Sequence, residues 1–326
     1  MPNKDAGGEM TVEIGLNAAI VAMVDRSPRI LVVSEGGDGG LDALPFGPFD
    51  PAMHRTFETS LRARVEEQTA LDLGYIEQLY TFGDHGRQRL ANEDRLHMVS
   101  VGYLALTRSD PETTLRLAEV GAQWRDWYAY LPWEDWRRGR PAVLDRVILP
   151  ALAAWERDDP ANRRSRLRLA FGLDDFPFDE ERVLERYELL YEAGLVAESR
   201  SDAEGHGLET RPDGVGQGVG LAMRHDHRRI VATAVARLRG KIKYRPVIFE
   251  LMPPEFSLTR LQEAVEAISG RHLHKQNFRR LVEGASLVEP TGMTTGATGG
   301  RPAALFRFRR QILDERPAPG LKLGSR

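Results

Sequence analysis

The side chains best suited to contact a partner molecule lie in one short segment near the C-terminus, residues 273–285. Four apolar residues in it follow the spacing i, i+3, i+4 and i+7, namely Phe278, Leu281, Val282 and Ala285. This spacing predicts an amphipathic helix with one buried stripe. On the helical wheel, Gln276 and Arg280 point directly away from that stripe. Asn277 and Arg279 flank it. Amide and guanidinium groups hydrogen-bond base edges and phosphates, so the exposed face predicts contact with DNA.

The charge of the chain is divided unevenly between its two ends. Residues 226–326 contain 19 Lys or Arg and 9 Asp or Glu, whereas residues 1–225 contain 26 and 39. The overall net charge of −3 therefore hides a basic segment joined to an acidic one. A basic segment attracts nucleic acid or another polyanion, and only one half of this chain is suited to that role.

The basic segment has the element order of a winged helix-turn-helix. Asp226 is expected to cap a helix that runs to about Lys241, and Ser257 a second helix that ends before Gly270. The other expected elements are a strand at 247–251, the helix of residues 273–285, a strand at 286–289, a Gly-rich turn, and a last strand at 304–308. Winged helix domains have this order of elements. The expected DNA contacts are Lys275, Gln276, Asn277, Arg279, Arg280, the wing residue Arg301, and Thr259 and Arg260 of the preceding helix.

The rest of the chain divides into two parts. Strand patterns at 11–24, 30–34, 75–83 and 97–106, with a turn at Ser27-Pro28 and a helix at 55–70, favour a mixed α/β layer domain. The next part is helical and holds all five tryptophans, for which a core or dimer surface is the favoured interpretation and a base-stacking platform the alternative. A Gly- and Asp-rich linker follows it. The expected domains are residues 1–110, a helical insertion and linker at 111–222, and the winged helix at 223–326.

Composition narrows the class of protein. A length of 326 residues with 41% hydrophobic content allows two or three domains with cores of their own. The absence of cysteine excludes disulfides and thiolate metal sites. The start of the chain lacks the pattern of a signal peptide, and no apolar run is long enough to span a bilayer. We therefore expect a soluble, cytoplasmic protein.

Five segments together resemble the Nudix-related transcriptional regulators of NAD biosynthesis, in particular the longer alphaproteobacterial NAD regulators. They are Glu77–Asp84, Val99–Leu106, Pro253–Gln262, Asn277–Arg280 and Gly300–Pro302. The resemblance covers roughly residues 10–108 and 222–310. It implies an α+β fold, with a Nudix-like mixed α/β sandwich, a helical insertion and a C-terminal winged helix-turn-helix. It also implies a homodimer that represses genes of NAD synthesis or salvage from a palindromic operator and senses ADP-ribose, NAD or another adenine nucleotide.

The Nudix box, in contrast, is degraded. A working box places glutamates at helical spacing so that several carboxylates converge on Mg²⁺. Aligning its final Gly-aliphatic pair on Ala70-Leu71 puts Arg64, Glu67 and Gln68 at those positions, so one carboxylate of three remains. We therefore expect neither a catalytic residue nor a bound metal or cofactor, and no enzyme activity.

The pocket could still bind a nucleotide. Arginines can meet a diphosphate directly through charge-assisted hydrogen bonds, although the same side chains could simply be solvated surface charges. The expected effector-binding residues are Arg64, Glu67, Phe82, Asp84, Arg87 and Arg89. Two other readings stay open: a Nudix-type pyrophosphohydrolase with an accessory basic domain, and a winged helix that binds only protein. The basic face of the helix at 273–285 disfavours the second.

Overall fold

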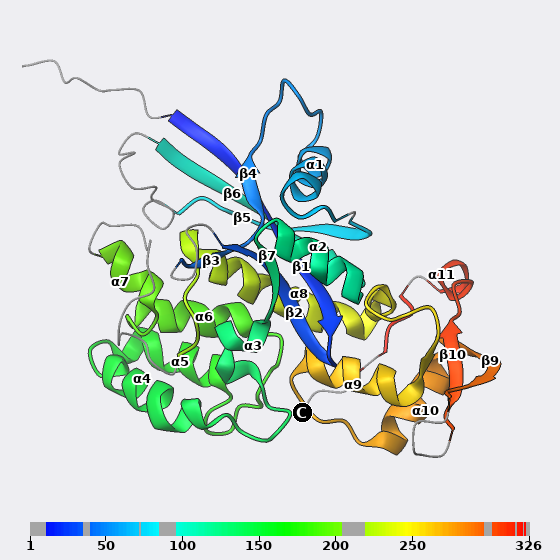
Figure 1. Ribbon diagram of the computed structural model, residues 1–326. Coiled ribbons are helices and arrows are strands. Elements are labelled where there is room, and N and C mark those ends of the chain that lie inside the picture. The colour runs from blue at the N-terminus through cyan, green and yellow to red at the C-terminus, as the bar shows by residue number, and fades with distance from the viewer. Residues whose placement is uncertain are drawn as a thin grey trace, which may run out of the picture.

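The computed structural model describes residues 11–34, 40–71, 73–84, 96–203, 219–296, 302–316, 318–321 and 323 (Figure 1). Its architecture is the expected α+β class. A Nudix-like sheet with helices on both faces is joined to a block of helices and to a small winged helix, as the colours of Figure 1 show. No helix among these residues is long and apolar enough to cross a membrane.

In the described part of the chain, seven strands form the larger sheet, in the order β3-β2-β1-β6-β5, with β4 paired to β1 and β7 to β2. The strands are β1 (Thr11–Val24), β2 (Ser27–Ser34), β3 (Asp42–Ala43), β4 (Phe46–Pro48), β5 (Tyr75–Phe82), β6 (Leu96–Leu106) and β7 (Ala122–Asp126). The two longest, β1 and β6, run parallel, and the other pairs are antiparallel. β1 therefore lies at the centre and is covered on both faces.

The two faces of β1 belong to two different cores. Leu16 and Ile20 face a core that includes Leu61 of helix α1 (Phe57–Thr69) and a residue of α2 (Pro111–Glu119). The alternate residues Ala19 and Val21 face a larger core that continues into the helices behind the sheet. Alternation of side chains along a strand produces this division, and it gives the sheet two chemically separate sides.

The expected turn at Ser27-Pro28 is wrong by two residues. Asp25 and Arg26 form the turn, with φ of 50° and 63°, and Val24 pairs with Ser27. A two-residue hairpin turn with positive φ at both positions matches the twist of the flanking strands, and Asp tolerates that conformation. β2 therefore begins earlier than its β-branched residues suggested.

The helical insertion begins beside β2 and β7, and its later helices pack against one another. Its elements are α3 (Trp127–Tyr130), the 3₁₀ helix η2 (Pro132–Glu134), the π-helix η3 (Leu144–Ile148), α4 (Leu149–Glu156), α5 (Pro160–Phe171), α6 (Val183–Glu192) and α7 (Ala197–Ala203). Trp127 and Trp133 are fully buried in the larger core, as the favoured interpretation requires. The turn before α4 is a π-turn, because Pro150 has no N–H for the regular ladder.

Helix α8 (His227–Tyr244), which follows the short 3₁₀ helix η4 (Arg224–Asp226), lies across the second face of the sheet. Lys241 and Arg237 form ion pairs with Glu77 of β5. Asp226 was expected to cap α8 with its side chain, and this is wrong: the residue has φ of 54°, and its carboxylate accepts a hydrogen bond from Tyr187 at 2.6 Å. The boundary expected at residue 223 stays a prediction, because α8 packs on both the sheet and the next helix.

The winged helix completes the chain. It contains the 3₁₀ helix η5 (Val247–Glu250), β8 (Phe256–Ser257), α9 (Leu258–Ser269), α10 (Lys275–Ala285), β9 (Val288–Thr294), β10 (Ala304–Phe308) and α11 (Ile312–Glu315). Its three-stranded sheet has the order β8-β10-β9. The strand expected at 247–251 is wrong. A strand exposes alternate residues, whereas the helical turn of η5 buries Val247, Ile248 and Phe249 in succession.

One buried cluster of charged groups ties these parts together. Glu134 of η2 is fully buried and accepts hydrogen bonds from Arg186 at 2.6 and 2.9 Å and from Arg239 at 2.6 Å. Arg239 lies on α8 and also donates to the carbonyl of Ile268 near the end of α9, at 2.9 Å. Burial alone would raise the pKa of Glu134, but the two guanidinium groups outweigh it and hold this pKa below its usual value. The insertion, α8 and α9 therefore share one buried ionic contact.

Candidate nucleic-acid interface and effector site

The face of α10 predicted to contact DNA is exposed. Phe278 and Val282 are 3% and 0% exposed, and Leu281 and Ala285 are partly buried, so the predicted stripe holds the helix against the domain. The predicted contact residues of this helix are all exposed: Lys275, Gln276, Asn277, Arg279 and Arg280. A polar face of this composition, presented on the second helix of a helix-turn-helix, fits the major groove of DNA.

Hydrogen bonds fix the orientation of α10. The amide of Gln262 on α9 donates to the carbonyl of Leu273 at 2.8 Å, and Glu266 accepts the N–H of Leu273 at 2.8 Å. These bonds hold the turn between the two helices. On the exposed face, Arg280 donates to Asn277 at 3.0 Å, which links two predicted contact residues. The surface is therefore held in place before any ligand arrives, which lowers the entropic cost of binding.

The other predicted DNA contacts fall in two places. Thr259 and Arg260 are exposed on the first turn of α9, which Ser257 caps. They line a cleft of about 390 Å³ beside the β1–β2 turn, where Arg26 pairs with Glu263 at 3.3 Å. They therefore lie apart from the polar face of α10, next to the sheet domain. Arg301 of the wing lies outside the described residues.

On the α1 side of the sheet, the helix at the position of the Nudix box keeps one of the three expected carboxylates, Glu67. The side chain of Thr56 caps its start, and Ala70 ends it with φ of 53°, at the position where the Nudix box has glycine. The amide of Gln68 donates to the carbonyl of Phe46 at 2.9 Å and accepts its N–H at 3.2 Å. Gln68 therefore joins the helix to β4 and is not free to bind a ligand.

The remaining two residues of the degraded box pair with each other. Arg64 donates to the carboxylate of Glu67 at 3.0 Å, and its side chain packs against the backbone of Gly47. Both side chains are partly or largely exposed, at 38% and 70%. Arg64 thus lies beside Gly47 with its side chain partly exposed, in reach of an anionic ligand.

The structure does not bring the predicted effector residues together. Phe82 is buried in the larger core, on the face of the sheet opposite α1. Asp84 follows it and forms an ion pair with Arg229 of α8 at 2.5 Å, and the guanidinium of Arg229 lies over the ring of Phe82. Arg64 and Glu67 lie on the α1 side, and Arg87 and Arg89 lie outside the described residues. The predicted set is therefore split between two faces.

Two residues near β4 were missed from the sequence. His227 is fully buried, and its Nδ1 accepts the N–H of Leu44 at 2.9 Å. Burial, with the nearby His225 and Arg224, holds the pKa of His227 well below its usual value. The other is Arg229, which pairs with Glu188 of the insertion at 2.5 Å. Both residues lie in a polar stretch of the sequence, and nothing in that stretch indicates that they contact Leu44 and Glu188. The described residues contain no group of three metal-ligating side chains.

Comparison with known proteins agrees with this geometry. Residues 248–308 match the NrtR DNA-binding winged helix domain. A curated relative, the ADPR responsive transcriptional repressor NtrR of Acinetobacter baylyi, is 41% identical over 98 residues. This match covers 30% of the present chain and spans 39% of the length of that repressor.

Solved structures share the fold of almost the whole chain. NrtR of Shewanella oneidensis complexed with a 27mer DNA superposes with a TM-score of 0.54 at 21% identity, covering 92% of this chain and 95% of that one. A MutT/nudix family protein from Enterococcus faecalis has a TM-score of 0.50 at 13% identity, covering 94% and 90%. The fold and the helix-turn-helix define a Nudix-like domain joined to a DNA-binding winged helix. Residues 248–308 thus form a winged helix domain of the NrtR type, and the chain as a whole shares the fold of the NrtR structure.

Proposed function

We propose that the protein is a DNA-binding transcriptional repressor of NAD biosynthesis or salvage genes, and that its Nudix-like domain senses an NAD-related nucleotide. The observation that carries the DNA-binding part is the exposed polar face of α10, held by Gln262 and Glu266 within a matched winged helix. The name of the Acinetobacter relative states a response to ADPR, which makes ADP-ribose the first effector to test. A repressor of chromosomal genes implies a cytoplasmic location.

The state of α1 supports a sensor in preference to an enzyme. A hydrolase needs several carboxylates on a divalent metal. In this helix Glu67 faces Arg64, and Gln68 is bound to the backbone of β4. A nucleotide diphosphate could accept hydrogen bonds from Arg64 without any metal, since a guanidinium is a good bidentate donor to phosphate. The name of the Acinetobacter relative, a transcriptional repressor, agrees with this proposal.

Nucleotide binding to the Nudix-like domain must also change how the winged helix binds DNA. Helix α8 offers the route, because it packs on the sheet through Lys241 and Glu77 and holds α9 through Arg239 and the Ile268 carbonyl. A nucleotide that binds two arrangements of α8 unequally would shift the position of α9 and α10. The coupling between the two sites would be about 1 to 3 kcal/mol, or roughly 5- to 150-fold in DNA affinity.

The test begins with the DNA sequence. The full-length protein selects duplexes from a random library, and the enriched sequence is labelled and titrated by fluorescence anisotropy with and without ADP-ribose, NAD or ATP. We expect one of these nucleotides to change the Kd for DNA within the range above. Arg64→Ala should reduce that response and leave nucleotide-free DNA binding intact, whereas Arg116→Ala, an exposed arginine on α2, should leave both unchanged. If no sequence is enriched, the proposed DNA binding by the winged helix is contradicted. If no nucleotide changes the Kd for DNA, the proposed nucleotide sensing is contradicted.

A further inference from the structure

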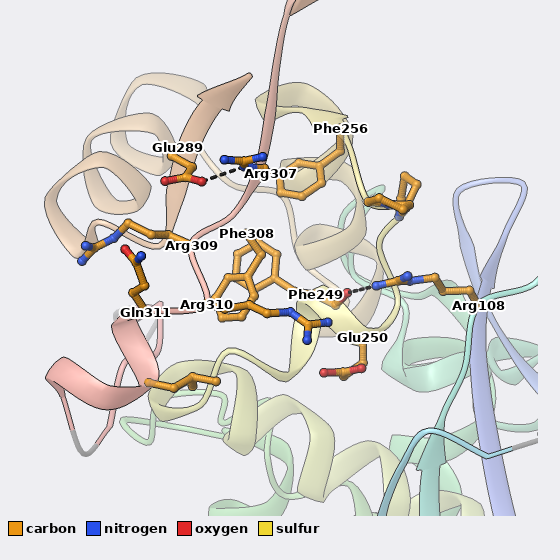
Figure 2. Close-up of a pocket in the computed structure, with 13 residues that line it drawn as sticks. Arg108, Phe249, Glu250, Phe256, Glu289, Arg307, Phe308, Arg309, Arg310 and Gln311 are labelled. Atoms are coloured by element: carbon orange, nitrogen blue, oxygen red, sulfur yellow. Dashed lines mark hydrogen bonds and ion pairs between the residues drawn. The ribbon is translucent and has the colours of Figure 1, made fainter. Parts of the chain in front are cut away.

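A second cavity, of about 590 Å³, lies where the winged helix meets the end of β6 (Figure 2). Its volume is within the range of about 300 to 1,000 Å³ that is usual for small-molecule sites. One wall is aromatic and comes from η5, β8 and β10. It is formed by Phe249, Phe256 and Phe308, and the rings of Phe249 and Phe308 stack at 4.4 Å. None of the residues predicted to bind the effector lines this cavity.

The charged lining of the cavity is mainly cationic. It contains four arginines and two glutamates, namely Arg108, Arg307, Arg309, Arg310, Glu250 and Glu289. Two of the arginines are neutralised, since Arg307 pairs with Glu289 at 2.6 Å and Arg309 with Glu315 at 2.6 Å. Two cations therefore remain for a ligand.

Those two cations enter from different parts of the protein. Arg108 follows β6 of the Nudix-like sheet and makes a single, long hydrogen bond of 3.4 Å to the carbonyl of Phe249. Arg310 follows β10 of the winged helix, and its side chain makes no hydrogen bond or ion pair with any described residue. Figure 2 shows both guanidinium groups on the side of the cavity next to Glu250.

We propose that this cavity binds a small phosphorylated molecule that carries a flat ring. Arg108 and Arg310 would hold the phosphate by charge-assisted hydrogen bonds. Phe308 is partly exposed and Leu313 is 50% exposed, so together they offer an apolar surface for the ring. Glu250 would accept a hydrogen bond from a hydroxyl or amino group of the ligand and would repel additional negative charge.

DNA is a poorer occupant than a small molecule. The cavity is walled by one chain from several sides, and a volume of about 590 Å³ suits a small molecule better than the backbone of a duplex. A small ligand fits this volume, and it would bridge Arg108, which follows β6 of the larger sheet, to Arg310, which follows β10 of the winged helix. Its binding would therefore favour one position of the winged helix. This site is additional to the nucleotide response of the α1 face and does not depend on it.

ADP is the probe, because it combines a diphosphate with a flat ring. Isothermal titration uses the full-length protein with Arg64→Ala, so that the α1 face does not contribute. Loss of a hydrogen bond to a charged group costs about ten- to a hundredfold in affinity, so Arg108→Ala and Arg310→Ala should each weaken ADP by about that factor. Arg116→Ala is the matched surface control and should change nothing. Glu250→Gln should strengthen ADP, because it removes a repelling carboxylate. Adenosine and pyrophosphate should each bind more weakly than ADP.

Three outcomes would overturn the proposal. The first is the absence of ADP binding, or a Kd for ADP that neither Arg108→Ala nor Arg310→Ala raises. The second is adenosine or pyrophosphate that binds as tightly as ADP, since the site would then not recognise both parts of the ligand. The third is a loss of nucleotide-free DNA binding in Arg108→Ala and Arg310→Ala with ADP binding unchanged, which would make the arginines DNA contacts. The effect of ADP-ribose on DNA binding is measured on the protein with Arg64 intact. Failure of the proposed function can then be distinguished from failure of this second site.

Discussion

Gln68 stands where the Nudix box has a carboxylate, and its side chain holds α1 in place on β4. An amide has both a donor and an acceptor, so it pairs with the N–H and the carbonyl of Phe46, which a carboxylate could not do. Arg64 then supplies a positive charge at the position of a metal ligand and pairs with Glu67. The helix keeps its position on β4 and β1, and we propose that it binds a divalent ion poorly because two of the three carboxylates are replaced.

We therefore expect no metal-dependent hydrolysis of ADP-ribose or NAD. The pure protein is incubated with each nucleotide and Mg²⁺ or Mn²⁺, and AMP is followed by chromatography beside a working Nudix hydrolase. Typical enzymes turn over at roughly 1 to 10³ per second. Release of AMP at such a rate would show that the protein is a Nudix-type pyrophosphohydrolase despite the altered residues of its box, Arg64, Glu67 and Gln68.

Ala70→Gly should stabilise the protein. Ala70 ends α1 in the left-handed region, with φ of 53°, where a residue with a Cβ is strained by about 1 kcal/mol and glycine is not. The midpoint of urea unfolding should rise. Ala63→Gly, at an exposed position inside the same helix, is the matched control and should lower stability by about 1 kcal/mol. Equal effects of the two changes would mean that the strain at Ala70 is absent in solution.

Elements with a strong period and a clear cap could be predicted from the sequence. The run Thr11–Val24 is the strand β1, Ser257 and Gly270 cap α9, and β10 has the predicted bounds. Elements whose residues face a distant partner could not. Helix α5 was missed, and η5 was taken for a strand because three consecutive apolar residues give no period.

The candidate site was predicted to a similar extent. The exposed face of α10 follows from local spacing alone, so it was found. The structure divides the predicted effector set, because Phe82 is buried in the larger core whereas Arg64 lies on α1, on the other face of the sheet. Whether these residues bind the effector stays a prediction. The face that a residue of β5 occupies depends on how β5 pairs with β6. That pairing joins segments far apart in the sequence, so it leaves no local signal.

Arg280→Ala should weaken specific DNA binding by roughly 1 to 3 kcal/mol and relax the preference at one base position. Arg280 is exposed on α10 and oriented by Asn277. Arg301→Ala, in the wing, should instead weaken all sequences and flatten the salt dependence by about one unit. Anisotropy titrations of the selected and scrambled duplexes at several salt concentrations separate the two effects. Full affinity and specificity in the Arg280→Ala protein would remove α10 from the interface.

Arg239→Met should destabilise the contact between the elements strongly. It leaves the buried Glu134 with one guanidinium and the Ile268 carbonyl without its donor, a loss of about 3 to 5 kcal/mol for a broken buried pair. Arg237→Met, on the same helix, removes a pair in which Arg237 is 40% exposed and should cost less than about 1 kcal/mol. Urea unfolding followed by tryptophan fluorescence compares them. Equal midpoints for the two variants would show that the buried cluster adds nothing to stability.

At the scale of the whole molecule, α8 joins the acidic Nudix-like part of the chain to the basic winged helix. Separate domains on a flexible linker could not transmit a ligand signal efficiently, whereas α8 packs on the sheet, the insertion and α9. The winged helix of one chain presents one α10, which reads only a few base pairs. Two chains related by a twofold axis would present two such helices, which is why we propose a dimer on a palindromic operator.

This proposal fixes the spacing of the DNA sequence. Two recognition helices in successive major grooves lie about 34 Å apart, so the half-sites should be centred about 10 base pairs apart or a multiple of that. Inserting five base pairs between them turns the second half-site to the opposite side of the duplex, so that one dimer can engage only one half. Affinity should then fall toward that for unrelated DNA, which is typically about 10³-fold weaker or more. Changing the sequence of the spacer at constant length is the control and should have a much smaller effect. Light scattering should show twice the mass of the chain in solution and on the duplex. A monomer that binds the selected sequence with full affinity, or a duplex that tolerates the five-base-pair insertion, would rule out the symmetric dimer and leave each winged helix acting alone.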